Sequence, residues 1–120
     1  MLSPSRRVRS AAIAANTYLT AAIDLEGEIL TAVQVPAAWT AAGLTFQSSH
    51  DGETFGDVYD DDGTEISLTS AAIVTSRFVV LKESTRDLFR GIRHIKIRSG
   101  TGASPVTQSA LRTLQLTTRQ

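Results

Sequence analysis

The sequence lacks cysteine, has only one tryptophan, two tyrosines and four phenylalanines among 120 residues, and carries no net charge. Without cysteine, a disulfide framework, a thiolate zinc site and a cysteine nucleophile are excluded. Twelve basic residues balance twelve acidic ones, which argues against a general nucleic-acid binder. No apolar run approaches the roughly 20 residues of a membrane-spanning helix, so we expect no membrane partner. The length suits a single domain with an ordinary core.

Short apolar stretches with a period of two predict an all-β protein. Ile95 and Ile97 alternate with basic residues, and Leu114 and Leu116 alternate with polar ones, as expected of half-buried strands. Further strands are expected at residues 8–18, 28–35, 44–47, 55–59, 66–68 and 78–81, with 55–59 pairing with 44–47. The continuous apolar run 78–81 suits a strand covered on both faces. The expected core residues are Phe46, Phe78, Val80, Ile95, Ile97, Leu114 and Leu116.

Glycine-containing turn signals separate these stretches at about ten-residue spacing, which is typical of a β-sandwich or barrel. They occur at Glu26-Gly27, Asp51-Gly52, Asp62-Gly63 and residues 99–102. We expect about eight strands in two antiparallel sheets, with short helical turns near residues 36–42 and 84–90. Residues 1–10 are interpreted as a flexible basic arm, and residues 11–120 as the sandwich domain.

Charge is distributed unevenly along the chain. Residues 51–65 contain seven carboxylates and no base, whereas residues 66–120 contain nine bases and two acids. Such charges are usually solvated, because an exposed ion pair contributes only about 0–1 kcal/mol. In an assembly, the acidic stretch of one copy would instead meet a basic surface of another. The candidate protein-contact residues are therefore Asp60, Asp61, Asp62, Arg90, Arg93 and Arg98, together with Arg6, Arg7 and Arg9 of the basic arm, which we expect to help dock the domain on a partner.

The acidic stretch partly resembles a calcium loop. An EF-hand register with Gly63 at the sixth position places Val58 and Thr69 at the first and twelfth positions, where carboxylates are needed. The EF-hand interpretation therefore fails. A looser calcium site in this turn stays open, beside the simpler interpretation of a solvated hairpin loop.

Other chemistry has little to build on. His50 and His94 are the only histidines, and a zinc site would need a distant carboxylate such as Asp51 as well. The sequence has no nucleophile elbow, no metalloprotease helix and no phosphate-binding loop. We therefore expect no enzyme and no cofactor.

Two binding functions have candidate side chains in the sequence. Trp39, Phe55 and Tyr59 are candidate contacts of a carbohydrate-binding β-sandwich, although a core of this size claims most of the aromatic residues. The arginines between residues 86 and 98 have no interleaved aromatic for base stacking and follow an acidic stretch that repels phosphate. They suit a protein-docking surface better than nucleic acid.

Three phrases of the sequence carry a resemblance. After Trp39, residues 44–65 read LTFQSSHDGETFGDVYDDDGTE, residues 98–101 read RSGT, and residues 105–108 read PVTQ. Residues 33–117 resemble a family of small proteins encoded among the structural genes of tailed phages and of gene transfer agents of alphaproteobacteria. Val58 departs from this pattern, in which leucine is expected.

The resemblance implies a non-enzymatic virion component with a jelly-roll-like β-sandwich, similar to head-spike bases or capsid decorations. Its implied partners are the major capsid protein or other virion proteins and further copies of itself, and its implied location is the outer surface of the head. A tail-associated structural protein is the alternative that the resemblance leaves open.

Overall fold

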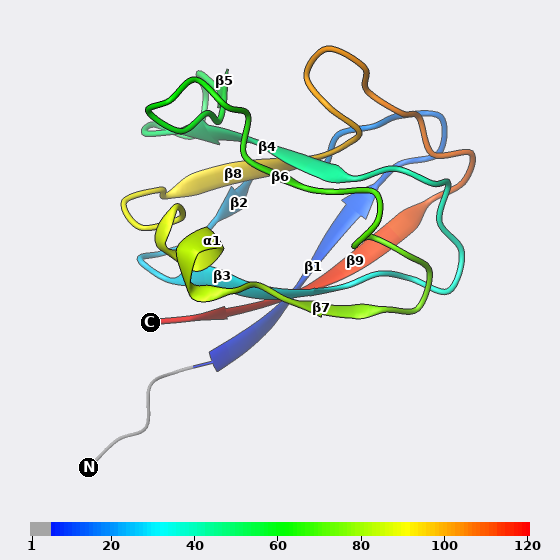
Figure 1. Cartoon of the computed structure of the whole chain (residues 1–120), viewed down its shortest axis with the longest axis horizontal. Helices are drawn as coiled ribbons and strands as arrows, with labels where there is room; N and C mark the ends of the chain where they lie inside the picture. The colour runs from blue at the N-terminus through cyan, green and yellow to red at the C-terminus, as the bar shows by residue number, and fades with distance from the viewer. Residues whose placement is uncertain (1–5) are drawn as a thin grey trace.

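The computed structural model describes residues 6–120, in which nine strands and one short helix form two antiparallel sheets packed face to face (Figure 1). The first sheet contains β1 (Arg6–Ile13), β3 (Ile29–Gln34), β7 (Phe78–Val80) and β9 (Arg112–Arg119). The second contains β2 (Ile23–Asp24), β4 (Leu44–Ser49), β5 (Gly56–Asp57), β6 (Ser67–Leu68) and β8 (His94–Ser99). The helix is α1 (Glu83–Asp87). The expected all-β sandwich is confirmed, and no helix in the described range is long and apolar enough to cross a membrane.

The strand order is that of a jelly roll. The first sheet runs β1-β9-β3-β7 and the second runs β2-β8-β4-β5, with β6 also paired to β4. Most consecutive strands alternate between the two sheets, so the chain winds around the core and its first strand pairs with its last. The β1–β9 pair is eight residues long, from Arg6 opposite Arg119 to Ile13 opposite Arg112.

The core lies between the two inner faces and follows the alternation read from the sequence. Five of the seven expected core residues are fully buried, which confirms β4, β8 and β9 as strands with one face in the core. β9 is half-buried as expected, whereas β4 and β8 have no exposed residue, because other segments cover the outer face of the second sheet. They are Phe46, Ile95, Ile97, Leu114 and Leu116. Phe89, which follows α1, packs edge-on against Phe46 with ring centroids 5.0 Å apart and closes one end of the core.

The expectation that residues 78–81 are covered on both faces is wrong. Phe78 and Val80 are 55% and 70% exposed, whereas Val79 packs against the core and Leu81 is buried. The reason is position, because β7 is the edge strand of the first sheet and only its inner face meets the second sheet. The segment alternates like any half-buried strand, but apolar side chains occupy both faces.

The expected basic arm is also wrong for residues 6–10, which form the first part of β1 and pair with β9. Arg7 and Arg9 alternate with Val8 along this strand, and their guanidinium groups reach Glu26 and Glu28. The sequence around Arg7 and Arg9 does not read as a strand, because the carboxylates that pair with these arginines lie about 20 residues further along the chain. Residues 1–5 of the expected arm lie outside the described residues.

Of the two expected helical turns, the one at residues 84–90 is confirmed by α1, whereas residues 36–42 contain bends and no helix. The side-chain amide of Gln108 accepts from the backbone N–H of Thr40 at 2.8 Å and donates to its carbonyl oxygen at 3.0 Å. These two hydrogen bonds satisfy the backbone groups that a helical turn would have used. Gly27 and Gly100 adopt positive φ in turns expected from the sequence.

Replacing a phenylalanine by alanine should lower stability far more in the core than on the outer face of the first sheet. We expect Phe46→Ala to lower the free energy of unfolding by about 3–5 kcal/mol, because it empties a fully buried site. Phe78→Ala removes the same atoms from an exposed site and should change stability by less than about 1 kcal/mol. Urea denaturation of both variants measures the difference, and equal losses would contradict this placement of β7.

Candidate protein-contact surfaces

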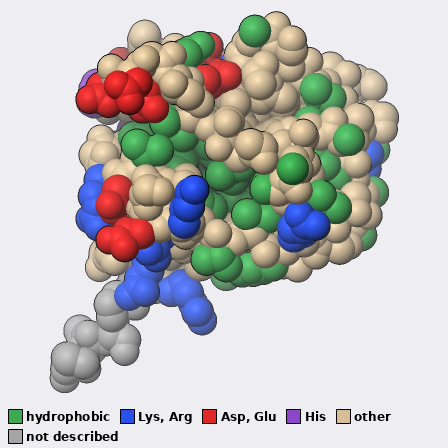
Figure 2. Space-filling view, viewed as in Figure 1, with side chains coloured by type: hydrophobic (Ala, Val, Ile, Leu, Met, Phe, Trp, Pro, Cys, Tyr) green, Lys and Arg blue, Asp and Glu red, His purple; other side chains and the backbone are tan. Residues whose placement is uncertain are grey.

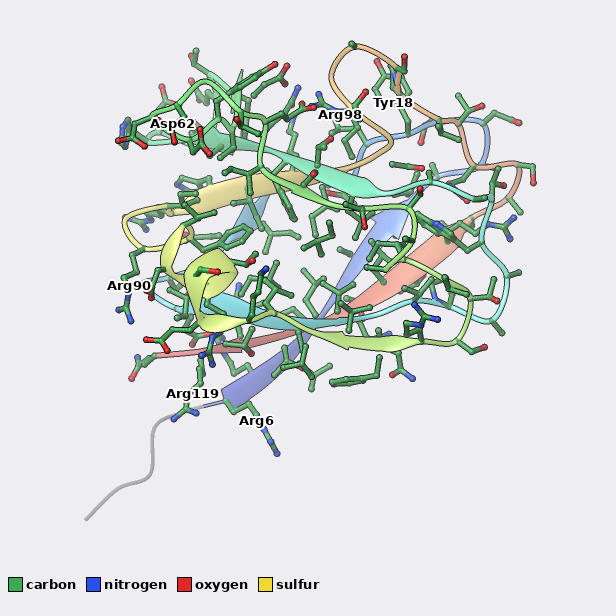
Figure 3. The ribbon with its side chains drawn as sticks, viewed as in Figure 1. Arg6, Tyr18, Asp62, Arg90, Arg98 and Arg119 are labelled. Atoms are coloured by element: carbon green, nitrogen blue, oxygen red, sulfur yellow. The ribbon has the colours of Figure 1, made fainter. Side chains whose placement is uncertain are left out.

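Arg98 is not available as the surface contact expected from the sequence, because it is only 4% exposed and bound within its own chain. Its Nε donates to Thr45 Oγ1 at 3.0 Å, and its two terminal nitrogens donate to Asp57 and Glu65 at 2.9 Å each. Figure 3 shows Arg98 on the second sheet, beside the loops that cover its outer face. The hydrogen bond from Arg98 lowers the pKa of Asp57. The cluster of Arg98, Thr45, Asp57 and Glu65 is called the Arg98 clamp below.

The Arg98 clamp explains two of the phrases that carry the resemblance. Asp57 and Glu65 lie on either side of the acidic loop, defined as residues 59–64, and fix both of its ends to β8. Glu65 also accepts from the backbone N–H of Gly102 at 3.0 Å, and Thr45 Oγ1 donates to the carbonyl of Gly100 at 2.7 Å. These two stretches of sequence are therefore held together by one network of hydrogen bonds and ion pairs.

The acidic loop projects from the clamp as a tight hairpin. Asp60 caps it, because its carboxylate accepts from the backbone N–H groups of Asp62 and Thr64 at 2.9 Å each. Carboxylate oxygens of Asp60, Asp61 and Asp62 lie within 4.8 Å of one another, and Tyr59 beside them is 53% exposed. Figure 2 shows acidic side chains gathered at this end of the second sheet. The expected hairpin is present, and hydrogen bonds hold its two ends and its turn. It presents three carboxylates and one aromatic ring on the surface.

Arg7 and Arg9 are bound to carboxylates of the β2–β3 turn. Glu28 is almost fully buried and accepts from Thr118 Oγ1 at 2.6 Å, Arg7 Nε at 2.9 Å and Arg9 at 3.3 Å. The hydrogen bonds from Thr118 and Arg7, together with the charges of Arg7 and Arg9, lower the pKa of Glu28, against the effect of burial. These two arginines therefore fasten β1 to the sandwich.

Arg90 and Arg93 lie in exposed ion pairs at one end of the sandwich. Arg90 Nε is 3.0 Å from Asp87, and Arg93 is 3.3 Å from Asp24. Together with Phe89 and the Glu26–Glu28 turn they line an open groove of about 710 Å³. Both charges already have partners, so this groove offers little unbalanced charge to a ligand.

The outer face of the first sheet carries a surface that the sequence analysis missed. Strand register places Val8 opposite Thr117, Thr117 next to Ala32 and Ala32 opposite Val80, so one row crosses all four strands. Val8 and Val80 are 69% and 70% exposed at the two edges, and Ala32 and Thr117 form the floor between them. Phe78 is exposed one pleat further along β7.

Arginines flank this apolar row. Arg6 and Arg119 stand directly opposite each other on β1 and β9, and both project away from the first sheet in Figure 3. With Arg86 of α1 they line a groove of about 460 Å³ over the row, and no acidic side chain of the described range lines it. These three arginines form no ion pair within residues 6–120. The surface is called the arginine-rimmed groove below.

The candidate carbohydrate contacts and metal ligands expected from the sequence lie at separate places in the fold. Trp39 is buried and donates to the carbonyl of Ala42 at 3.1 Å, as the core interpretation expected, and Phe55 is half covered beneath Lys96. The carboxylate of Asp51 caps its own loop, and bonds from Thr54, Glu53 and Ser49 lower its pKa to about 2. Within residues 6–120, the acidic loop holds the one cluster of three potential metal-ligating side chains.

Comparison with protein-family models, curated proteins and solved structures finds no match for the chain. The resemblance stated from the sequence therefore stays a prediction.

Removing Arg98 should lower stability far more than removing Arg93, the exposed arginine directly before β8. Arg98→Met leaves Asp57 and Glu65 without their counter-charge, and we expect a loss of about 3 kcal/mol in unfolding free energy. Arg93→Met breaks an exposed pair and should cost less than about 1 kcal/mol. Chemical denaturation at pH 7 compares the two variants, and a harmless Arg98→Met would contradict the structural role of the clamp.

Acid should destabilise the protein partly through Glu28. Its pKa is lowered in the folded state from an ordinary value of 4.5, so its stabilising effect is complete above that value and is lost as the pH falls through the folded pKa. We expect the melting temperature to fall as the pH falls below about 4.5, and Glu28→Gln to flatten that dependence. Melting curves between pH 3 and 7 test this. An unchanged pH slope in Glu28→Gln would exclude Glu28 as a contributor.

Proposed function

We propose that the chain is a non-enzymatic structural protein of a virion, a capsid decoration or head-spike base on the outer surface of the head. The observation that carries a structural function is the arginine-rimmed groove, which exposes Val8, Phe78 and Val80 together on one sheet face. Exposed apolar side chains that gather on one surface are typical of protein-interaction sites. A sandwich that exposes apolar side chains on one outer face, beside arginines that are unpaired within residues 6–120, suits a component that neighbouring proteins hold in place.

Two further observations support the proposal that the chain is a virion protein. The first is the resemblance of residues 33–117 to phage and gene-transfer-agent structural proteins. The second is the jelly-roll strand order, which recurs in viral capsid domains. Jelly rolls also occur in lectins, so a carbohydrate-binding module is the second candidate, and Tyr59 is its exposed aromatic contact.

Purified particles provide the test of the proposed function. An antibody raised against the folded chain should label the heads of particles from a bacterium that carries the gene, and the chain should co-sediment with them. Labelling at the tail would favour the tail-associated alternative. A chain found only in the free protein fraction would contradict the virion function, and glycan-array binding abolished by Tyr59→Ala would favour the carbohydrate module.

A pair of matched variants tests whether the groove contributes to incorporation. Val80→Ser removes an exposed apolar side chain from the groove, and the loss of roughly 1–1.5 kcal/mol of burial should weaken binding about fivefold to tenfold. Leu111→Ser makes the same kind of change at an equally exposed residue outside the groove and should leave occupancy unchanged. Quantitative blotting of gradient-purified particles compares the two. Equal occupancy of both variants would contradict a role of the groove.

A further inference from the structure

The arginine-rimmed groove and the acidic loop have complementary chemistry. The groove presents Arg6, Arg86 and Arg119 around exposed valine and phenylalanine side chains. The acidic loop presents three clustered carboxylates beside one exposed tyrosine. Arginine pairs with carboxylates and also stacks on aromatic rings, so each part of one surface has a suitable partner on the other.

The strand register supplies an independent reason to expect an anionic partner at the groove. Arg6 and Arg119 are directly opposite each other on neighbouring antiparallel strands, and like charges in that position destabilise a sheet. No carboxylate of residues 6–120 forms an ion pair with either of them, although Arg7 and Arg9 on the same strand each have two. An acidic group from outside the chain would relieve the repulsion.

The two surfaces cannot meet within one molecule. Asp62 lies beyond the second sheet, whereas Arg6 and Arg119 project from the far side of the first sheet (Figure 3). The Arg98 clamp holds both ends of the acidic loop on β8, and β1 and β9 hold the arginines, so neither surface can reach around the sandwich.

We propose that the arginine-rimmed groove binds the acidic loop of a second copy of this chain. Tyr59 and the carboxylates of Asp61 and Asp62 then lie against Phe78, Val80 and the groove arginines. The contact is heterologous, because a different surface is used on each partner, and it repeats to give a ring if the rotation closes or a filament if it does not. This inference deepens the proposed function by naming the partner of the same groove, and its test needs no virion particle.

Analytical ultracentrifugation of the full chain tests the contact. At low salt the wild type should sediment as a species heavier than the monomer. Raising the ionic strength from 0.1 to 1 M shortens the screening length from about 10 to about 3 Å, and we expect association to weaken at least tenfold. A wild type that is monomeric at low salt would overturn the inference, and this is also the result if the groove accepts another acidic partner.

Charge-reversal variants identify the two surfaces. Asp61→Lys with Asp62→Lys changes the acidic loop but keeps Asp60, which caps the hairpin. Arg6→Glu with Arg119→Glu changes the groove. Each double variant alone should be monomeric, with a circular dichroism spectrum like that of the wild type. An equimolar mixture should associate again, because each variant supplies a surface that the other has lost.

The control is Lys96→Glu, which makes the same kind of charge change on the second sheet, outside the groove, and should leave association intact. Loop variants that still associate like the wild type, or a mixture of the two double variants that stays monomeric, would overturn the proposal. Co-sedimentation with particles by a chain that is monomeric in solution would reject this contact while leaving the virion function in place.

Discussion

Each strand of a two-layer sandwich has one face in the core and one face outside, and this constraint sets where the surfaces of the molecule arise. On the second sheet, the outward side chain of Arg98 is covered by segments that bring Asp57 and Glu65 to it. On the first sheet, no segment within residues 6–120 covers the outward row from Val8 to Val80, which forms a groove. The two sheets share a core but differ in what covers their outer faces.

Internal ion pairing decides which charges remain for an outside partner. Glu26 and Glu28 occupy Arg7 and Arg9, and the Arg98 clamp uses two further carboxylates. Among the remaining groups, the carboxylates of Asp60, Asp61 and Asp62 form one cluster, and Asp62 lies beyond the second sheet, whereas Arg6 and Arg119 project beyond the first (Figure 3). A chain with zero net charge therefore has two strongly charged ends, and its overall composition does not describe its surface.

The sequence predicted what depends on local periodicity and missed what depends on topology. The alternation around Ile95, Ile97 and Leu116 was sufficient to place strands with one face in the core, because one apolar face produces a period of two. The exposure of Phe78 follows from the edge position of β7, which no local pattern contains. Likewise, the partners of Arg98 lie 41 and 33 residues away along the chain, so a buried clamp and a surface contact look alike in the sequence.

The closure of the jelly roll also creates the groove. Val8 comes from the first strand, Thr117 from the last, Ala32 from β3 and Val80 from β7, and only the order β1-β9-β3-β7 brings them into one row. The same β1–β9 pairing places Arg6 opposite Arg119. A chain whose first and last strands are unpaired therefore lacks both the apolar row and the arginine pair. A surface made from the most distant strands of the chain exists only in the completed fold, which makes any assembly through it conditional on folding.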